Sequence, residues 1–154
     1  MKNKLLFCLL ALLISFSLSA THMYSGYISY EKTNTTTNEY KITITTYTDS
    51  RSIPAHRAEY EVKLGYGSPS NEKTLILNSV DGSTQQVVGD YLWKNVYSGV
   101  HEFPTTQNSF TLSVIEPNMA SSVLNVNNGT SANVAVVFKT VLYNNENAHS
   151  PIFD

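Results

Sequence analysis

Apolar and polar residues alternate most regularly in the stretch 38–49, NEYKITITTYTD. Its side chains Tyr40, Ile42 and Ile44 fall on one side of an extended chain, and the lysine and threonines between them fall on the other. A repeat of two residues is typical of a β-strand with one buried face. The earlier stretch 26–31, GYISYE, alternates in the same way, and the polar loop between them suits a hairpin. We therefore expect these two strands to pair.

The chain after residue 50 consists of further short strand-like runs separated by turn-forming residues. We expect strands over 58–66, 73–78, 85–88, 91–100, 109–115 and 133–143. The last run is the most apolar, and its valines predict a strand that is buried on both faces. No run shows the pattern of an amphipathic helix. The sequence predicts an all-β fold, an antiparallel, immunoglobulin-like β-sandwich of about eight strands, with a β-barrel as the alternative.

The N-terminal residues 1–20 are expected to lie outside this fold. Lys2 and Lys4 give a basic start, an apolar run covers 5–18, and small residues follow. This is the organisation of a secretory signal peptide, and its apolar run is shorter than the roughly 20 residues that span a bilayer. We expect an exported protein, located in the periplasm, at the cell surface or in the medium. The expected parts are a signal peptide (1–20), a β-sandwich domain (21–148) and a C-terminal tail (149–154) that resembles the start of an interdomain linker.

Removal of the signal peptide changes the chemistry that the chain offers. The only cysteine, Cys8, leaves with it, so the mature domain has no disulfide and no thiol chemistry. Two lysines also leave, and the remaining 8 Lys and Arg residues stand against 12 Asp and Glu residues, a net charge of −4. No basic stripe remains to neutralise phosphates. We therefore expect no nucleic acid as a partner, and no membrane insertion after cleavage.

The residues that could bind a metal are spread along the chain. No two of the four histidines have the spacing of a ligand pair; they are His22, His56, His101 and His149. Three aspartates, Asp49, Asp81 and Asp90, fall at expected turns without the repeated spacing of a calcium loop. We assign these aspartates to turn hydrogen bonding and keep calcium as an alternative. The expectation is no metal site and no cofactor.

Two carboxylates, those of Glu59 and Glu61, share one face of an expected strand, an arrangement that can do acid–base work on sugars. They alternate with apolar residues and continue into Lys63, which favours a solvated strand face. The chain has no nucleophile elbow, no phosphate-binding glycine loop and no dinucleotide fingerprint. We therefore expect no catalytic residue, and a small secreted hydrolase is the last of the alternatives.

Ten tyrosines are the one unusual feature of the composition. Exposed tyrosines, together with many Asn and Thr residues, suit contacts with sugars or proteins. Half-buried strand tyrosines with solvated hydroxyls are the alternative interpretation. The residues that we expect at a ligand site are Tyr27, Tyr47, Tyr91, Trp93 and Tyr97, with Tyr24 as a further partly exposed tyrosine.

Several short motifs occur in a familiar order. They are Ala20-Thr21-His22 where the signal peptide ends, the stretch 26–31, the stretch 40–49, then 97–100, Phe103-Pro104 and finally 149–153, His-Ser-Pro-Ile-Phe. This order resembles the N-terminal domain of large secreted surface proteins of Bacteroidetes, often described as gliding-motility-associated or as carrying a C-terminal sorting domain. The resemblance covers nearly the whole mature chain, with Ser25 in place of a glycine and Thr48 in place of an arginine.

The resemblance implies a β-sandwich module and carries over no catalytic residue. In the family this domain leads into further immunoglobulin-like domains, so we expect the chain to correspond to the first domain alone. Together with the missing reaction chemistry, this predicts an exported, non-enzymatic module with a structural or adhesive role at the cell surface. A carbohydrate-binding module that uses exposed tyrosines is the alternative. The expected partner is a surface glycan or a protein, and the sequence predicts no oligomeric state.

Overall fold

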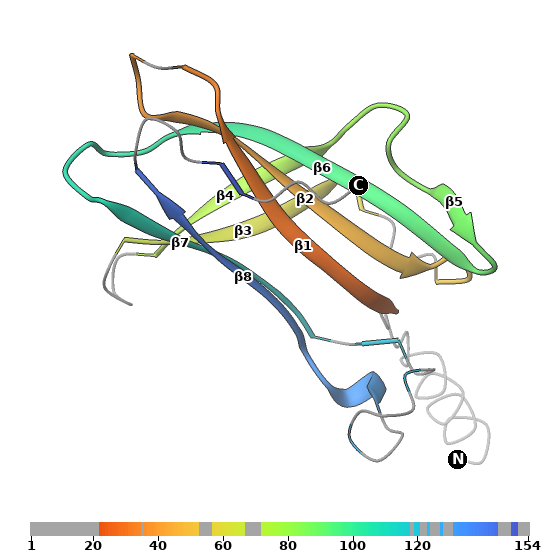
Figure 1. Cartoon of the computed structure of the whole chain (residues 1–154). Coiled ribbons are helices and arrows are strands. Elements are labelled where there is room, and N and C mark those ends of the chain that lie inside the picture. Colours follow the sequence, from red (N-terminus) through yellow and green to blue (C-terminus); the bar gives the residue numbers. More distant parts are fainter. Residues whose placement is uncertain are drawn as a thin grey trace, which may run out of the picture.

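Eight β-strands and one short 3-10 helix make up the described part of the protein (Figure 1). The strands are β1 (Met23–Lys32), β2 (Glu39–Asp49), β3 (Glu59–Gly65), β4 (Glu72–Ser79), β5 (Gln86–Gly89), β6 (Leu92–Glu102), β7 (Ser109–Glu116) and β8 (Val136–Tyr143), and the helix η4 is Ser131–Asn133. The computed structural model describes residues 22–34, 36–52, 57–66, 72–117, 119, 120, 123, 127, 131–144, 149 and 150. The expected signal peptide and His56 lie outside these residues.

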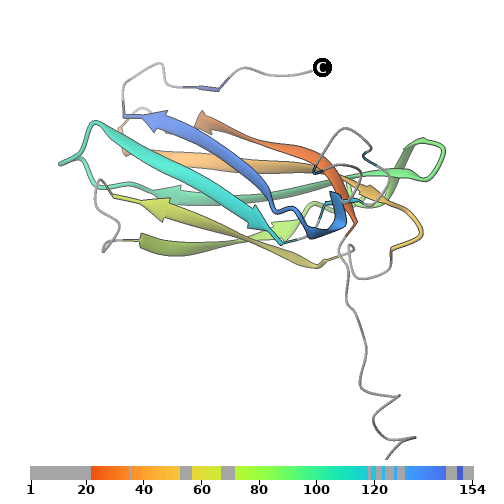
Figure 2. The same ribbon diagram turned by 90° about the horizontal axis from the view of Figure 1, so that it is seen from below.

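Strand pairing links all eight strands in one continuous sheet, which folds over on itself into two layers (Figures 1 and 2). One layer has the order β1-β2-β6-β5 and the other has the order β4-β3-β7-β8, with antiparallel neighbours throughout. The layers are joined by two residue pairs between β4 and β6, Asn78 with Ser98 and Ser79 with Tyr97. Because β1 and β8 also lie against each other, the sandwich has a partly barrel-like outline.

This connectivity is that of the immunoglobulin fold, in which strands A, B, E and D form one sheet and strands C, F and G form the other. Here β1, β2, β6 and β5 take the first four places, and β3, β7 and β8 take the other three. β4 is an additional strand beside β3. The predicted all-β, antiparallel, immunoglobulin-like sandwich is therefore confirmed.

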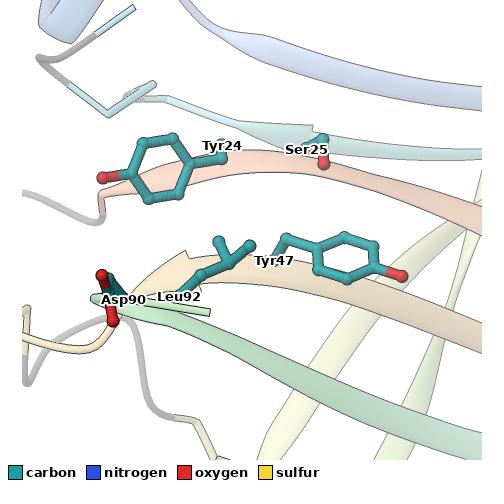
Figure 3. A pocket seen from close by; sticks show the side chains of 5 residues that line it. All are labelled: Tyr24, Ser25, Tyr47, Asp90 and Leu92. Carbon is teal, nitrogen blue, oxygen red and sulfur yellow. The ribbon is translucent and has the colours of Figure 1, made fainter. Parts of the chain in front are cut away.

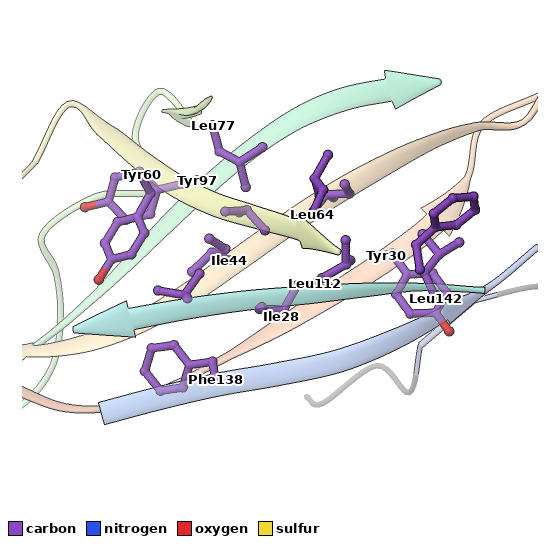
Figure 4. Packing of buried hydrophobic residues seen from close by; sticks show 14 of the residues in the cluster. Ile28, Tyr30, Ile44, Tyr60, Leu64, Leu77, Tyr97, Leu112, Phe138 and Leu142 are labelled. Atoms are coloured by element: carbon purple, nitrogen blue, oxygen red, sulfur yellow. The ribbon is translucent and has the colours of Figure 1, made fainter. Parts of the chain in front are cut away.

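The alternating stretch that the sequence singled out forms β2, the best-paired strand of the first layer. Tyr40, Ile42 and Ile44 are fully buried. The expected pairing with the preceding strand is confirmed, since Tyr30 lies opposite Ile42 and Ile28 lies opposite Ile44. Figure 4 shows Ile28 and Ile44 in one core with residues of the second layer such as Leu112. Each aliphatic side chain buried in this way stabilises the fold by about 1.5–3 kcal/mol before entropy is counted.

The expectation that the last strand is buried on both faces is wrong. In β8, Phe138 and Leu142 face the core, whereas Val137 and Tyr143 are each 58 % exposed. β8 is the last strand of its layer, and most side chains on its outer face are exposed. Its β-branched residues thus indicated a strand correctly, but they carried no information about what packs on the second face.

The edge of β1 is covered near both of its ends by segments distant in sequence. Ala120 donates its backbone N–H to the Met23 carbonyl at 2.7 Å. At the other end, Ser150 donates its N–H to the Tyr30 carbonyl at 3.0 Å and accepts the Tyr30 N–H on its hydroxyl at 2.9 Å. Residues 149 and 150, expected in a tail, therefore pair with the sandwich and shield part of a strand edge.

Substitution of Gly26 tests how closely the two layers approach. An added Cβ would lie 2.7 Å from the Thr45 carbonyl oxygen and 2.8 Å from the Phe138 ring. We expect Gly26→Ala to lower the free energy of unfolding, measured in urea, by about 1–3 kcal/mol because the core is overpacked. The control is Gly65→Ala, whose Cβ would meet its nearest atom at 3.4 Å. Equal stability of the two variants would contradict this packing of β8 on β1.

Candidate functional site

An open depression of about 420 Å³ lies on the outer face of the layer that contains β1, β2 and β6 (Figure 3). The residues that line it are Tyr24, Ser25, Tyr47, Asp90 and Leu92. Its walls are mainly apolar, with one carboxylate and the hydroxyl groups as polar points. Ligand pockets have this composition and volumes of about 300–1,000 Å³. The depression is therefore the candidate ligand site.

Strand register brings these residues together. Tyr47, on the central strand β2, lies opposite Ser25 on β1 and opposite Lys94 on β6. Two residues further along, Asp49 lies opposite Leu92. Side chains two apart on a strand point to the same face, so Tyr47, Asp49 and their partners share the outer surface of the layer.

Tyr24 reaches the depression because β1 contains an irregularity. Met23 pairs with Thr48, but Ser25 already pairs with Tyr47, so Tyr24 is an extra residue on β1. In a regular strand, Tyr24 and Ser25 would point to opposite faces. The bulge allows both residues to line the depression while Met23 remains in the core.

A buried carboxylate, that of Asp49, fastens the chain segments around the depression. Its side chain accepts three hydrogen bonds from Arg51, from the backbone N at 2.9 Å, from Nε at 2.8 Å and from Nη2 at 2.6 Å. It also accepts one from the Tyr24 hydroxyl at 3.2 Å. Its backbone N–H donates to the His22 carbonyl at 2.9 Å. The last residue of β2 thus holds both the start of β1 and the loop that follows β2.

Arg51 extends this connection to the turn between β5 and β6. Its guanidinium carbon lies 4.5 Å from the centre of the Tyr91 ring, and the neighbouring Ser50 N–H donates to the Tyr91 carbonyl at 3.0 Å. Tyr91 has a φ of 59°, a left-handed conformation that costs a non-glycine residue about 1–2 kcal/mol. A glycine would satisfy this turn without strain. The tyrosine side chain adds a contact that glycine cannot make, because its ring packs on the Arg51 guanidinium.

The charges in this network reinforce one another. The pKa of Asp49 lies well below its ordinary value because the Arg51 side chain donates hydrogen bonds to the carboxylate. Burial opposes this lowering, and the Arg51 backbone and the Tyr24 hydroxyl add to it. The same hydrogen bonds raise the pKa of Arg51. The pair is therefore fully ionised at neutral pH, and it holds the walls of the depression in one arrangement.

The structure separates the five aromatic residues that were expected at a ligand site. Tyr47 lines the depression, and Tyr91 is 60 % exposed beside it. Tyr27 is half-buried in β1, two residues beyond Ser25. Trp93 is half-buried and lies in register with the buried Thr48. The expected exposure of Tyr97 is wrong, because it lies opposite Ile44 on the inner face of β6 and is fully buried.

Sequence reasoning missed the polar half of the site. Asp49 and Asp90 were assigned to turn hydrogen bonding, with calcium as the alternative, and Arg51 was not considered. One local signal was present, since Asp49 accepts the N–H of Arg51 two residues later in the manner of an Asx-turn. The link from this turn to Tyr24 and Tyr91 depends on strands that are distant in sequence, and no local pattern predicts it.

The site also bears on the metal and membrane expectations. Among the described residues, no group of three or more His, Cys, Asp and Glu side chains is placed to hold a metal ion. Asp49, one of the aspartates considered for calcium, forms an ion pair with the guanidinium of Arg51. Within the same described ranges, no helix has the length and apolar character that crossing a bilayer requires.

Comparison with protein-family models, with curated proteins and with solved structures finds no match for this chain. The candidate site is therefore interpreted from its own geometry and chemistry.

The pH dependence of stability tests the Asp49 network. Because the folded-state pKa of Asp49 is lowered, its contribution is complete above the unfolded pKa of about 3.9 and is lost as the pH falls below that value. We expect Asp49→Asn to lower the free energy of unfolding at neutral pH by about 2 kcal/mol, because hydrogen bonds to a charged group are lost. The difference from the wild type should shrink between about pH 4 and pH 2 in urea titrations.

The matched control for this experiment is Asp81→Asn, because the Asp81 carboxylate is exposed at a turn. Its stability should follow the wild type at every pH. A stability difference for Asp49→Asn that stays constant down to the lowest pH would contradict the lowered pKa.

Proposed function

We propose that this protein is an exported, non-enzymatic β-sandwich module with an adhesive or structural role at the cell surface. It contacts its partner through the depression around Tyr24 and Tyr47. One observation carries this proposal: the Asp49–Arg51 pair contacts both walls of the depression. One wall is the start of β1, and the other is the β5–β6 turn. A surface held in its bound form loses less entropy on binding.

The lining residues favour binding over catalysis. Asp90 supplies the one carboxylate among the lining residues that the structure describes, and none of these is a histidine, lysine or cysteine. Among the described lining residues, Ser25 has no histidine or lysine to activate it, and Asp90 has no second carboxylate to pair with. The Asp49 carboxylate is occupied by Arg51 and Tyr24. The described lining residues therefore support binding better than proton transfer to a bound substrate.

Carbohydrate is the ligand class that a specific observation favours. The rings of Tyr24 and Tyr47 both border the depression (Figure 3). Tyrosine rings offer a flat apolar surface to the C–H faces of a sugar, and their hydroxyl oxygens can also accept hydrogen bonds. The carboxylate of Asp90 and the hydroxyl of Ser25 can accept hydrogen bonds from sugar hydroxyls at the same surface. The wild-type module is therefore proposed to bind a surface glycan.

The proposed export and family rest on the sequence. The basic start, apolar run and small residues of 1–20 support a signal peptide. The ordered motifs from Ala20 to Phe153 support kinship with the N-terminal domain of secreted Bacteroidetes surface proteins. An immunoglobulin-like module agrees with a role in such a protein, because this architecture presents loops and sheet faces on a rigid scaffold.

Replacement of Tyr47 tests both the site and the ligand class. Purified wild-type protein is applied to a glycan array and coated on beads that are mixed with bacterial cell envelopes. We expect saturable binding to one glycan class and adhesion of the beads. Tyr47→Ala should weaken glycan affinity at least tenfold, roughly 1.4 kcal/mol, because a ring that packs on the sugar is lost.

The matched control is Tyr143→Ala, because Tyr143 is 58 % exposed on the opposite layer. This variant should bind and adhere like the wild type. Adhesion without any glycan binding would remove the carbohydrate candidate and leave a protein partner. Equal loss in both variants, or adhesion unaffected by Tyr47→Ala, would contradict the proposed site.

A further inference from the structure

A lysine that makes no ion pair borders the tyrosine depression. Lys94 on β6 lies opposite Tyr47 on β2, and residues directly opposite each other in an antiparallel pair share one face of the sheet. Lys94 also follows Leu92, a lining residue, by two positions on β6, and such residues point to the same face. The Lys94 side chain is therefore on the outer face of this layer, beside the lining residues Tyr47 and Leu92.

The other positive charges of the described chain are, apart from one, already in contact with a carboxylate or a ring. Four form ion pairs and two lie over tyrosine rings: Lys41 with Glu31, Arg51 with Asp49, Arg57 with Glu116, Lys63 with Glu61, Lys32 over Tyr40 and Lys73 over Tyr66. Within the described residues, only Lys94 and Lys139 have neither kind of contact. Lys139 is on β8, in the opposite layer. Lys94 is thus the one positive charge beside the depression that has no partner among the described residues.

The surface around Lys94 is closed by side chains. Lys94 is half-buried between Leu92 and Val96, which are half-buried on the same face of β6. Thr45, opposite Val96, is only 3 % exposed although it is on this outer face. A lysine in such a setting lays its aliphatic stem on its neighbours and keeps the ammonium group in water. The ammonium can therefore meet a ligand in the depression with less loss of side-chain freedom than a fully exposed lysine.

The two charges of this surface are at opposite ends of the depression. Asp90 precedes Leu92, and Lys94 follows Leu92 by two residues, roughly 6.6 Å further along β6. Figure 3 shows Asp90 and Leu92 at one end of the depression, with the Tyr47 ring extending away from them. Asp90 and Lys94, both described, form no ion pair with each other. A ligand that packs on the Tyr47 ring can therefore bring hydroxyl groups to Asp90 and a negative group to Lys94.

We propose that the glycan bound at the depression is acidic, and that the ammonium of Lys94 binds its carboxylate or sulfate group. This inference rests on the carbohydrate-binding function proposed above and names the class of sugar. A lysine ammonium is a compact charge with three donors, so it can bind such an anion and still donate to a neighbouring hydroxyl. The chain after residue 20 has a net charge of −4 and does not attract anions in general. A preference for an acidic sugar therefore comes from this local charge.

A glycan array that carries each acidic glycan beside its neutral parent tests this proposal. Uronate oligomers are paired with their methyl esters, sialylated glycans with their asialo forms, and sulfated glycans with their desulfated forms. We expect the purified protein to bind the acidic member of a pair more strongly, and the pair that binds identifies the source of the anion. Equal or stronger binding to the neutral members would overturn this inference and leave the carbohydrate function standing. Absence of binding to every glycan would overturn both.

Substitution of Lys94 locates the anion. In titrations with the bound acidic glycan and its neutral parent, the wild type should prefer the acidic form roughly fivefold, the effect of a partly exposed ion pair. Lys94→Gln should bind the two forms equally, and it should unfold in urea like the wild type because Lys94 has no described partner to lose. The matched control Lys139→Gln removes the other unpaired lysine and should keep the preference. A preference that persists in Lys94→Gln, or disappears in Lys139→Gln, would overturn the assignment.

Discussion

The structure around the candidate site depends on one buried carboxylate, that of Asp49. Removing a carboxylate from water is costly unless hydrogen bonds and an opposite charge replace the lost hydration. Asp49 obtains both from Arg51, two residues later, and a further hydrogen bond from Tyr24. The same guanidinium supports the Tyr91 ring. Three segments that are distant in sequence are thereby fixed at the end of β2, and the depression forms between them.

The rest of the sandwich supplies a rigid base for this arrangement. The chain has no cysteine after Cys8, so apolar burial and strand pairing hold the layers together. β2 pairs along nearly its whole length with β1 and over its full length with β6, which keeps the tyrosine surface on continuously hydrogen-bonded strands. The second layer is less complete, because β3 and β7 separate after three residue pairs. The candidate site therefore lies on the more completely paired of the two layers.

Local alternation predicted the elements well and their surroundings less well. Tyr40, Ile42 and Ile44 are buried as expected, because a repeat of two residues reports directly on a strand with one wet face. The abundance of tyrosine suggested that Tyr97 is exposed, but only the register with Ile44, more than fifty residues earlier, decides its face. The bulge that turns Tyr24 outward has no sequence signal of its own. The sequence therefore predicted that tyrosines line the candidate site, but it identified only some of the residues that do.

Hydrogen exchange of the amides in the wild type and in Asp49→Asn tests the central claim most directly. If Asp49 fastens the segments around the depression, protection should fall in residues 22–27 and 86–93 and stay unchanged in β3, β7 and β8. Local openings of this kind are measured separately from global unfolding when core amides keep their protection. Unchanged protection at the start of β1 and at the β5–β6 turn, or a uniform loss over both layers, would contradict the account.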